Sequence, residues 1–430
     1  GFCVLLQLAV SELLGPRPLD AGPLLGLFGA VFLARSWITG GTSAGFSFVD
    51  TPVQYQQDPV ARFLTYVYFH AKYAQLMVFP WTLSWEYSYD ALPDLTGTWQ
   101  DLRVLAILSA YLGVVAMAAW GFGRRSRPVL IGLSNVIIPF VPASNLFFVV
   151  GVTVGERLLY PSNVGAALVV SSFGSRKRPR LFKALSALLI TFACLSSLRT
   201  YQWSTRSILF EVDARSYPRS TKLRHQLGTV LHKMEKFDEA LSHFKASEEI
   251  FDGSGLTQYC MAQIYIETGR AAEAVERFEK ILSGNRLGFG AHNSFALYVD
   301  YGFALMLLRR FEEAVPQLKQ GLTFNEDVPH GLNALGYCYM HLQKAEEAKD
   351  AFEKGLKYEQ DNPYLLNNLG VTLIMGGHLN QGAQLVAQAA KMEPKVPAFG
   401  HNVLVLNTLA DTGQWPKEQL VLELFFNRGD

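Results

Sequence analysis

Three clusters of charged and aromatic residues in the first half of the sequence are candidates for a functional site, because ionisable residues at a membrane boundary are uncommon without a function. They are Tyr68, His70, Lys72 and Tyr73; Trp85, Glu86, Tyr87, Tyr89 and Asp90; and Glu156, Arg157 and Tyr160. The planar guanidinium of Arg157 could hold a lipid phosphate through two parallel hydrogen bonds. His70 and Lys72 could serve the same purpose. The alternatives for Arg157 are an ion pair with Glu156 or a side chain that extends to the membrane surface.

Several other classes of site are not indicated by the sequence. It contains no Gly-rich phosphate loop ending in Lys-Ser/Thr, no GxSxG and no HExxH motif. The four cysteines (Cys3, Cys194, Cys260 and Cys338) have neither the spacing of a zinc site nor that of a disulfide framework. We therefore expect no metal site and no bound cofactor, while any metal requirement of the reaction stays open. The net charge is +1 and neither half is strongly basic, which argues against nucleic-acid binding.

The elements that would position these clusters are apolar segments of membrane-spanning length. A spanning helix needs about 20 mostly apolar residues. Segment 60–81 is ambiguous, because it is aromatic but carries Arg62, His70 and Lys72, and it could be a polar-lined span or an interfacial helix. The other candidate spans are 22–38, 101–122, 129–154 (interrupted by Pro139 and Pro142), the short 158–173, and 181–198. Residues 1–200 are thus predicted to form a multi-span membrane domain.

Two short basic loops orient these spans. They contain Arg124, Arg125 and Arg127, and Arg176, Lys177, Arg178 and Arg180. Basic loops face the cytosol, so everything after Arg199 is predicted to lie on the opposite, lumenal or extracellular side. Residues 156–161 and the aromatic stretch 80–101 fall on that side as well. The aromatic residues of this stretch would anchor the interface or, alternatively, line a sugar or lipid site.

The second half of the sequence repeats with a period of 34 residues. Ala240, Ala274, Ala314 and Ala348 follow one another at steps of 34, 40 and 34 residues. Each stands twelve residues after a small residue and four before Phe or Leu, a pattern typical of tetratricopeptide repeats, which are helix-turn-helix units. Repeats are predicted to begin near Thr221, Gly255, Phe295, Pro329 and Pro363, with a partial repeat from Pro397 and a closing helix over 417–426.

The predicted repeats, over 221–430, would follow a linker at 201–220 and stack into an α-solenoid with a concave groove. The residue two positions before each small residue is expected to face this groove. Asp300, Asn368 and Asn402 are the polar candidates there, since an Asn amide both donates to and accepts from a peptide backbone. Helix capping or simple solvation is the alternative. The repeats by themselves predict protein binding without catalysis.

Two segments resemble the transmembrane and tetratricopeptide repeat-containing proteins. The first is PVARFLTYVYFHAKYAQLMVFPWTLSWEYSYDALP (Pro59 to Pro93), within a signature region at about 40–93, and the second is IPFVPASNLFFVVGVTVGERLLYPS (Ile138 to Ser162). The order of signature region, further spans and repeats also agrees, so the resemblance covers nearly the whole chain. It implies an all-α protein of the endoplasmic reticulum membrane, with a glycosyltransferase C-like membrane domain followed by lumenal repeats.

The resemblance also implies an activity. Members of this family are regarded as mannosyltransferases that move mannose from dolichyl phosphate mannose to Ser or Thr of cadherin-like proteins. The donor phosphate would be held by candidates among Arg157, Glu156, His70 and Lys72, and the repeats would present the acceptor protein. In this fold the catalytic acid lies in the first lumenal loop. Because the sequence begins with Gly1 inside an apolar run, we expect that loop upstream of Gly1 and leave the catalytic base unknown.

The alternative is a non-catalytic, membrane-anchored repeat scaffold for protein–protein interaction in the endoplasmic reticulum. A transporter-like membrane domain with a repeat adaptor is a third reading, although no inverted repeat of spans supports it. The signature segment contains Asp50 and Asp90, but neither matches the catalytic motif of the family.

Overall fold

The computed structural model describes residues 51–87, 89–95, 101–146, 153–173, 179–284 and 295–412. All regular secondary structure in these ranges is helical, as expected for an all-α chain. The contacts divide the chain into two compact units, Gly1–Asp252 and Gly253–Asp430, which we call the first and the second unit. The predicted apolar span at 22–38 and the closing helix at 417–426 lie outside the described residues.

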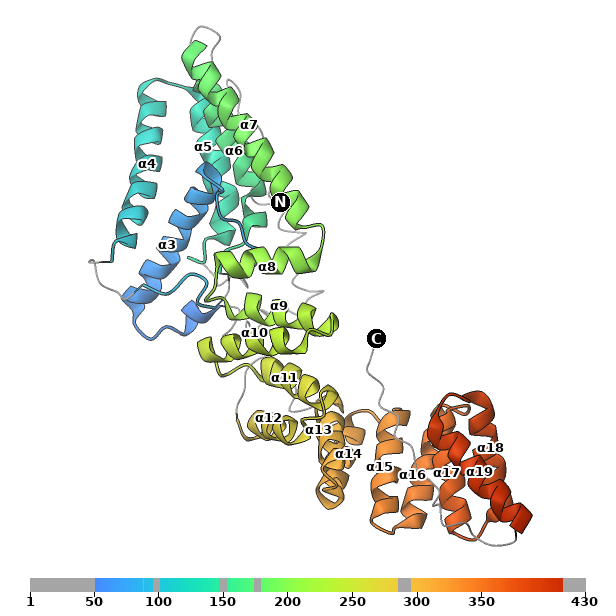
Figure 1. Ribbon diagram of the computed structural model, residues 1–430. Helices are drawn as coiled ribbons and strands as arrows, with labels where there is room; N and C mark the ends of the chain where they lie inside the picture. The colour runs from blue at the N-terminus through green and yellow to red at the C-terminus, as the bar shows by residue number, and fades with distance from the viewer. Residues whose placement is uncertain are drawn as a thin grey trace, which may run out of the picture. The chain divides into compact units, whose positions relative to one another are not determined.

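The first unit begins with helices of 14 to 24 residues, and helices of 11 to 14 residues follow them (Figure 1). Its elements are η1 (Pro52–Tyr55), α3 (Pro59–Val78), α4 (Arg103–Gly123), α5 (Arg127–Phe140), η2 (Val141–Ala143), η3 (Glu156–Leu159), α6 (Tyr160–Phe173), α7 (Pro179–Gln202), α8 (Arg206–Ser216), α9 (Thr221–Lys233) and α10 (Phe237–Ile250). The first predicted repeat, formed by α9 and α10, therefore belongs to the same compact unit as the apolar helices.

Local sequence explains where the first of these helices starts and how it packs. Asp58 caps α3 by accepting a 2.9 Å hydrogen bond from the backbone N–H of Val60, and Pro59 fills the first helical turn, where it costs no hydrogen bond. One face of α3 then packs on α4 through a buried cluster of Leu64, Val67, Ala71, Leu95, Val104 and Ile107. Burial of these side chains fixes which face of α3 points outward.

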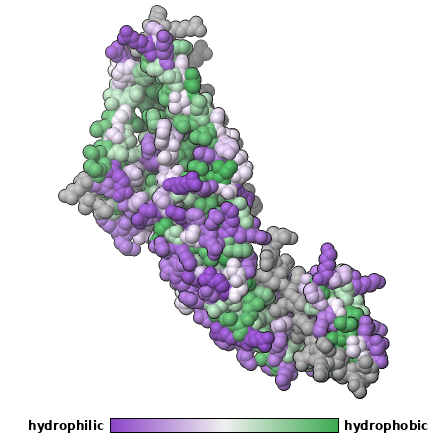
Figure 2. Space-filling view, in the orientation of Figure 1, coloured by the Kyte–Doolittle hydropathy of each residue, from purple (hydrophilic) through white to green (hydrophobic). Residues whose placement is uncertain are grey.

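Two of the described helices, α4 and α7, are long and apolar enough to cross a membrane. Large apolar side chains on α4, such as Leu105 and Phe122, are exposed, and Figure 2 shows apolar residues over this part of the first unit. The candidate span at 129–154, which Pro139 and Pro142 interrupt in the sequence, contains most of helix α5, and its residues 147–152 lie outside the described ranges. Helix α5 has only 14 residues and ends at Phe140, with Pro139 in its last turn and Pro142 in the following 3-10 helix. Proline removes a backbone donor and clashes with the preceding turn, so the helix stops there.

Helices α5 and α6 approach each other through glycines. A Cβ on Gly165 would overlap the carbonyl oxygen of Gly132, and one on Gly132 would lie 2.7 Å from a Val169 methyl group. The Ser162 hydroxyl donates a 2.9 Å hydrogen bond across this contact to the Val136 carbonyl. Small residues at the crossing let the backbones come close, as is common between helices in membranes. Helix α6 has 14 residues and, like α5, is shorter than a typical span.

The second unit is a series of helix pairs. Its helices are α11 (Gly255–Glu267), α12 (Ala271–Ser283), α13 (Phe295–Leu307), α14 (Phe311–Phe324), α15 (Pro329–His341), α16 (Ala345–Tyr358), α17 (Pro363–Met375), α18 (Leu379–Met392) and α19 (Pro397–Thr412). Helices begin at every residue where a repeat was predicted to begin, from Thr221 of α9 to Pro397 of α19.

The small and large residues of the repeat meet as their spacing predicts. A Cβ on Gly336 of α15 would lie 2.5 Å from the Phe352 ring of α16, and one on Gly228 of α9 would lie 2.8 Å from the Phe244 ring of α10. Both phenylalanines are fully buried. Each ring thus occupies the space that the missing side chain leaves, which sets the close crossing of the two helices in a pair.

Candidate functional site

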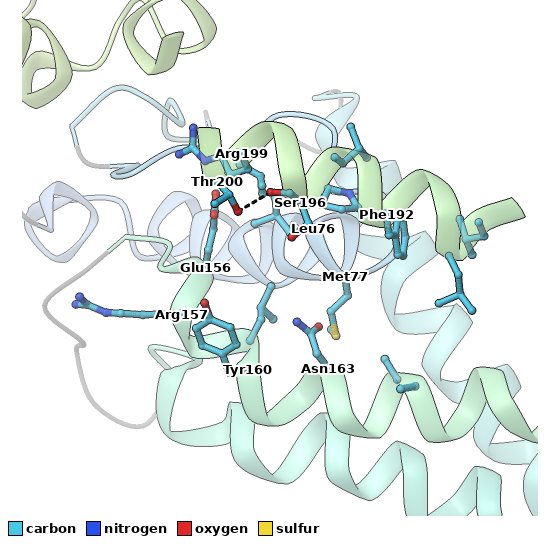
Figure 3. Close-up of a pocket in the computed structure, with 18 of the residues that line it drawn as sticks. Leu76, Met77, Glu156, Arg157, Tyr160, Asn163, Phe192, Ser196, Arg199 and Thr200 are labelled. Atoms are coloured by element: carbon cyan, nitrogen blue, oxygen red, sulfur yellow. Dashed lines mark hydrogen bonds between the residues drawn. The ribbon is translucent and has the colours of Figure 1, made fainter. Parts of the chain in front are cut away.

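A cavity of about 1350 Å³ lies within the first unit. Apolar side chains of α6, α7 and the end of α3 form most of its lining, and one end is polar (Figure 3). The polar end is formed by residues of η3, of the segment that follows α3 and of the last turns of α7: Ser84, Trp85, Glu86, Glu156, Arg157, Arg199, Thr200 and Trp203. The cavity therefore combines a long apolar wall with a cluster of charged groups at one end.

Glu156 is anchored at this polar end by two donors. Its Oε1 accepts hydrogen bonds from the backbone N–H of Ser84 and from the hydroxyl of Tyr87, both at 2.7 Å. Burial raises the pKa of the Glu156 carboxyl above its ordinary value, although these two hydrogen bonds oppose the shift. Burial and the adjacent Glu156 carboxylate raise the pKa of Tyr87 in turn. The Tyr87 hydroxyl therefore stays protonated and donates to Glu156.

Arg157, the predicted phosphate ligand, is exposed and lines the same cavity. Figure 3 shows its side chain extending away from Glu156, in the direction opposite to the apolar helices. It makes no hydrogen bond or ion pair with the residues that the structure describes, so the alternative of a Glu156–Arg157 ion pair is not realised there. An exposed arginine changes rotamer within nanoseconds, which leaves its guanidinium available to a ligand.

Arg199 is a cavity residue that sequence reasoning missed. It stands in the last turns of α7, is 9% exposed, and binds Asp213 of α8 through hydrogen bonds of 2.7 and 3.1 Å. Asp213 is fully buried and also accepts a 2.6 Å hydrogen bond from the backbone N–H of Trp85. From the sequence alone, an arginine at the end of an apolar span is interpreted as an anchor at the membrane interface. Only the fold brings it opposite a buried carboxylate.

His70 and Lys72, the other two phosphate candidates, lie outside the cavity lining. The imidazole of His70 is 2.6 Å from the Tyr111 hydroxyl and 2.7 Å from the Ser144 carbonyl, so it faces α4 and η2. Lys72 is buried and donates a 3.1 Å hydrogen bond to the side chain of Gln75. The structure thus brings Arg157 and Glu156 together and places His70 and Lys72 elsewhere. The role of all four in phosphate binding stays a prediction.

The aromatic stretch after α3 packs on the helices that end the first unit. Its ring contacts are Trp85 with Phe210, Tyr87 with Tyr217 and Tyr89 with Phe251, at centroid distances of 5.3, 5.1 and 4.7 Å. An ion pair between Asp90 and Arg219 joins the same two parts of the chain. Trp85 lines the cavity as well. This stretch therefore connects the polar end of the cavity to α8, to the segment between α8 and α9, and to the residue that follows α10.

The three peptide-groove candidates of the second unit are buried. Asp300 is 7% exposed and accepts a 2.6 Å hydrogen bond from the Tyr259 hydroxyl. Asn368 and Asn402 are 0% exposed. Their side-chain amides donate to the side chains of Asn333 and Asn367, at 2.8 and 2.9 Å. A row of amides across consecutive repeats thus exists, but these side chains bind one another, and peptide contact stays a prediction.

Within the described ranges, no group of three or more His, Cys, Asp or Glu side chains is arranged to hold a metal ion. Cys194 is exposed and Cys338 is buried, and both are free thiols. Burial raises the pKa of Cys338 to about 12, which keeps this thiol protonated and unreactive.

Two family models match the sequence. Residues 40–115 match "Protein O-mannosyl-transferase TMTC, DUF1736", and residues 329–362 match a tetratricopeptide repeat. The first match includes α3, the aromatic stretch and the start of α4.

Similar curated proteins carry the same name. The chain is 31% identical to mouse protein O-mannosyl-transferase TMTC1 over 231 residues, which is 50% of this chain and 24% of that protein. It is 31% identical to Drosophila melanogaster Tmtc3, over 53% of this chain and 26% of that protein. It is 26% identical to human TMTC3, over 66% of this chain and 33% of that protein. The chain thus spans between a quarter and a third of the length of these relatives.

Solved structures of repeat proteins also match, at low similarity. YrrB, described as a tetratricopeptide repeat protein with an unusual peptide-binding site, is 18% identical with a TM-score of 0.39, and the match covers 45% of this chain and 96% of YrrB. A MamA structure matches at 18% identity and a TM-score of 0.37, over 41% of this chain and 92% of MamA.

Taken with the two family models, the sequence matches identify the chain as a relative of the transmembrane and tetratricopeptide repeat-containing (TMTC) proteins.

Proposed function

We propose that the chain belongs to a protein O-mannosyltransferase that moves mannose from dolichyl phosphate mannose to Ser or Thr of cadherin-like proteins. The observation that carries this proposal is the cavity of the first unit, which has a long apolar wall and a charged end. The names of the relatives support the mannosyl-transfer chemistry. In this proposal the cavity holds the lipid donor, and the repeats bind the acceptor protein.

The shape of the cavity suits an amphipathic ligand. A polyprenyl chain would lie along the apolar side chains of α6 and α7, where burial of hydrocarbon is favourable at about 25 cal/mol per Å². The phosphate would lie at the polar end, near the exposed guanidinium of Arg157. A cation at that position would also stabilise the charge that develops on the phosphate when the sugar leaves.

The placement of charges along the first unit supports a lumenal position for this site. The loop with Arg124, Arg125 and Arg127 joins α4 to the start of α5. Glu156 is the first residue of η3, which comes after the end of α5 in the chain. The basic loop and Glu156 therefore lie at opposite ends of α5. With the basic loop in the cytosol, the polar end of the cavity faces the lumen of the endoplasmic reticulum, and so does the chain that follows α7.

The first experiment measures binding of dolichyl phosphate and of uncharged dolichol to the 430-residue chain in lipid nanodiscs. Arg157→Ala removes one charge-assisted hydrogen-bonding group, worth about 1.5–3 kcal/mol, so dolichyl phosphate should bind roughly ten- to a hundredfold more weakly. Dolichol binding should not change. Arg124→Ala is the matched control, because Arg124 is also exposed but lies at the opposite end of α5.

Equal binding of dolichyl phosphate by wild type and Arg157→Ala would remove Arg157 from the phosphate site. The second measurement is transfer of labelled mannose to a cadherin domain by the complete gene product in microsomes. Loss of transfer in Arg157→Ala is the expected result. A wild-type protein that neither transfers mannose nor binds the lipid, yet binds the cadherin domain, would favour the non-catalytic scaffold.

A further inference from the structure

The two oxygens of the Glu156 carboxylate have different surroundings. Oε1 accepts both hydrogen bonds of the group, from the backbone N–H of Ser84 and from the hydroxyl of Tyr87. Oε2 accepts no hydrogen bond from the residues that the structure describes, and Glu156 lines the cavity. The carboxylate is therefore held in place through Oε1, and it offers Oε2 as a hydrogen-bond acceptor to a group inside the cavity.

Two tryptophans at the same end of the cavity offer hydrogen-bond donors. Trp85 belongs to the aromatic stretch, Trp203 directly follows α7, and both are exposed residues of the cavity lining. The Trp85 ring contacts Phe210, and the Trp203 ring lies 5.7 Å from the guanidinium of Arg199. Neither indole N–H has a hydrogen-bond partner among the described residues. The polar end thus combines an available acceptor with available donors and aromatic rings.

The charges at this end favour an uncharged group beside Glu156. The guanidinium of Arg199 binds both oxygens of the buried Asp213, so its charge is already balanced. The carboxylate of Glu156 repels a phosphate. Figure 3 shows the Glu156 side chain pointing toward the end of α7 and the Arg157 side chain pointing away from it. A phosphate is therefore favoured near Arg157, and a neutral group that both donates and accepts hydrogen bonds is favoured beside Glu156.

We propose that Glu156, Trp85 and Trp203 bind the hydroxyl groups of the mannose that the lipid donor carries. This inference rests on the proposed function. A hydroxyl group both donates and accepts hydrogen bonds, so a sugar hydroxyl can donate to Oε2 and another can accept from an indole N–H. The C–H groups of the sugar ring can pack on an indole, whose face carries partial negative charge. The role is recognition of the sugar, and proton transfer stays with the acid that the family resemblance places in the first lumenal loop.

The variant Glu156→Gln tests the acceptor. The amide oxygen of Gln can accept both hydrogen bonds that Oε1 accepts now, whereas the amide nitrogen in place of Oε2 cannot accept one. Loss of a hydrogen bond to a charged group should weaken binding of dolichyl phosphate mannose about ten- to a hundredfold. Dolichyl phosphate should bind at least as tightly as it binds wild type, because the variant removes a negative charge from the polar end of the cavity.

The variant Trp203→Phe tests a donor, because it removes the indole N–H and keeps an aromatic ring. It should weaken binding of dolichyl phosphate mannose about two- to tenfold and leave dolichyl phosphate binding unchanged. Asp90→Asn is the matched control for Glu156→Gln, because Asp90 pairs with Arg219 and does not line the cavity. It should bind both lipids as wild type does. Arg157→Ala should show the opposite pattern and weaken both lipids by the same factor.

The experiment measures the dissociation constants of both lipids for the complete gene product in lipid nanodiscs. Wild type should bind dolichyl phosphate mannose more tightly than dolichyl phosphate. Equal affinities of wild type for the two lipids, or an unchanged affinity of Glu156→Gln for the mannose lipid, would overturn the sugar assignment and leave the proposed function in place. An equal loss of both lipids in Glu156→Gln would make Glu156 a structural anchor and would also overturn the assignment. Wild-type protein that binds neither lipid would overturn the proposed function and this inference with it.

Discussion

Replacing Asp300 by Asn should stabilise the second unit at neutral pH. The Asp300 carboxylate is 7% exposed, and its hydrogen-bond donors are uncharged: the Tyr259 hydroxyl at 2.6 Å and the Gln263 amide at 3.5 Å. Burial raises its pKa from 3.8 to about 6, against the lowering effect of these hydrogen bonds. Asn keeps an oxygen that accepts from Tyr259 and removes the charge.

The magnitude follows from the pKa shift. Between pH 3.8 and about 6 the folded protein binds more protons at Asp300 than the unfolded protein does. The free energy of unfolding therefore falls as the pH rises through this window and is constant above it. A shift of roughly two units corresponds to about 3 kcal/mol. Asp300→Asn should recover up to about that amount at pH 7.5 and should show no such dependence on pH.

Hydrogen exchange provides the assay, because it reports the opening free energy of individual helices in the intact chain. Amides of α11 and α13, which carry Tyr259 and Asp300, should exchange more slowly in Asp300→Asn at pH 7.5 than in wild type. The two proteins should converge as the pH falls toward 4. Asp350→Asn, at an exposed position of α16, is the control and should change nothing.

The reasoning would be refuted if Asp300→Asn exchanged as fast as wild type at pH 7.5, or faster. Equal exchange would mean that burying the Asp300 carboxylate costs no free energy, because water reaches it or because it is protonated in the folded protein. Faster exchange would mean that the charge itself strengthens the hydrogen bond from Tyr259 by more than burial opposes it.

Three further predictions test the packing of the two units. Asp213→Ala leaves the buried Arg199 without its carboxylate partner and should lower the free energy of unfolding by about 3–5 kcal/mol. Asp90→Ala breaks an ion pair with a mostly exposed arginine and should lower it by less than about 1 kcal/mol. Thermal unfolding in detergent compares the two variants, and equal effects would contradict the argument. Gly336→Ala places a methyl group against a buried phenylalanine ring and should cost about 1–3 kcal/mol, while Gly400→Ala, with open space around the new Cβ, should be nearly neutral in the same assay. Asn368→Ala removes a buried amide whose partners then lack hydrogen bonds, and it should lower the free energy of unfolding by about 1–3 kcal/mol. Weaker binding of the acceptor protein by this variant would therefore indicate recognition in the groove only if hydrogen exchange of α17 is unchanged.

The sequence predicted the candidate site only in part, for a reason that the residues illustrate. Glu156 and Arg157 are neighbours in one motif, so their joint position could be inferred from the sequence. Asp213, which pairs with Arg199, accepts a hydrogen bond from the Trp85 backbone across 128 residues of chain, and no local pattern records such a contact. His70 and Lys72 share a helix with residues that border the cavity, yet their side chains point to other neighbours.

The sequence alone determined the phase of the repeats and the residues at which their helices start. Helix starts depend on nearby residues, such as the proline in the first turn of α15, α17 and α19 and the capping Asn362 before α17. The fit of Gly336 against Phe352 likewise follows from a fixed spacing within one repeat. Such features involve short stretches of chain, so their physical causes are visible in the order of the residues.

Only the tertiary structure decided which polar side chains face a ligand and which face one another. Asn368 and Asn402 occupy the repeat positions expected to face the groove, yet burial among neighbouring repeats pairs them with other amides. The cavity is lined by residues of α3, η3, α6 and α7 and of the segment that follows α3, so it exists only where these elements pack together. Burial and pairing depend on every element packed around a group, and the spacing within any one element cannot specify them.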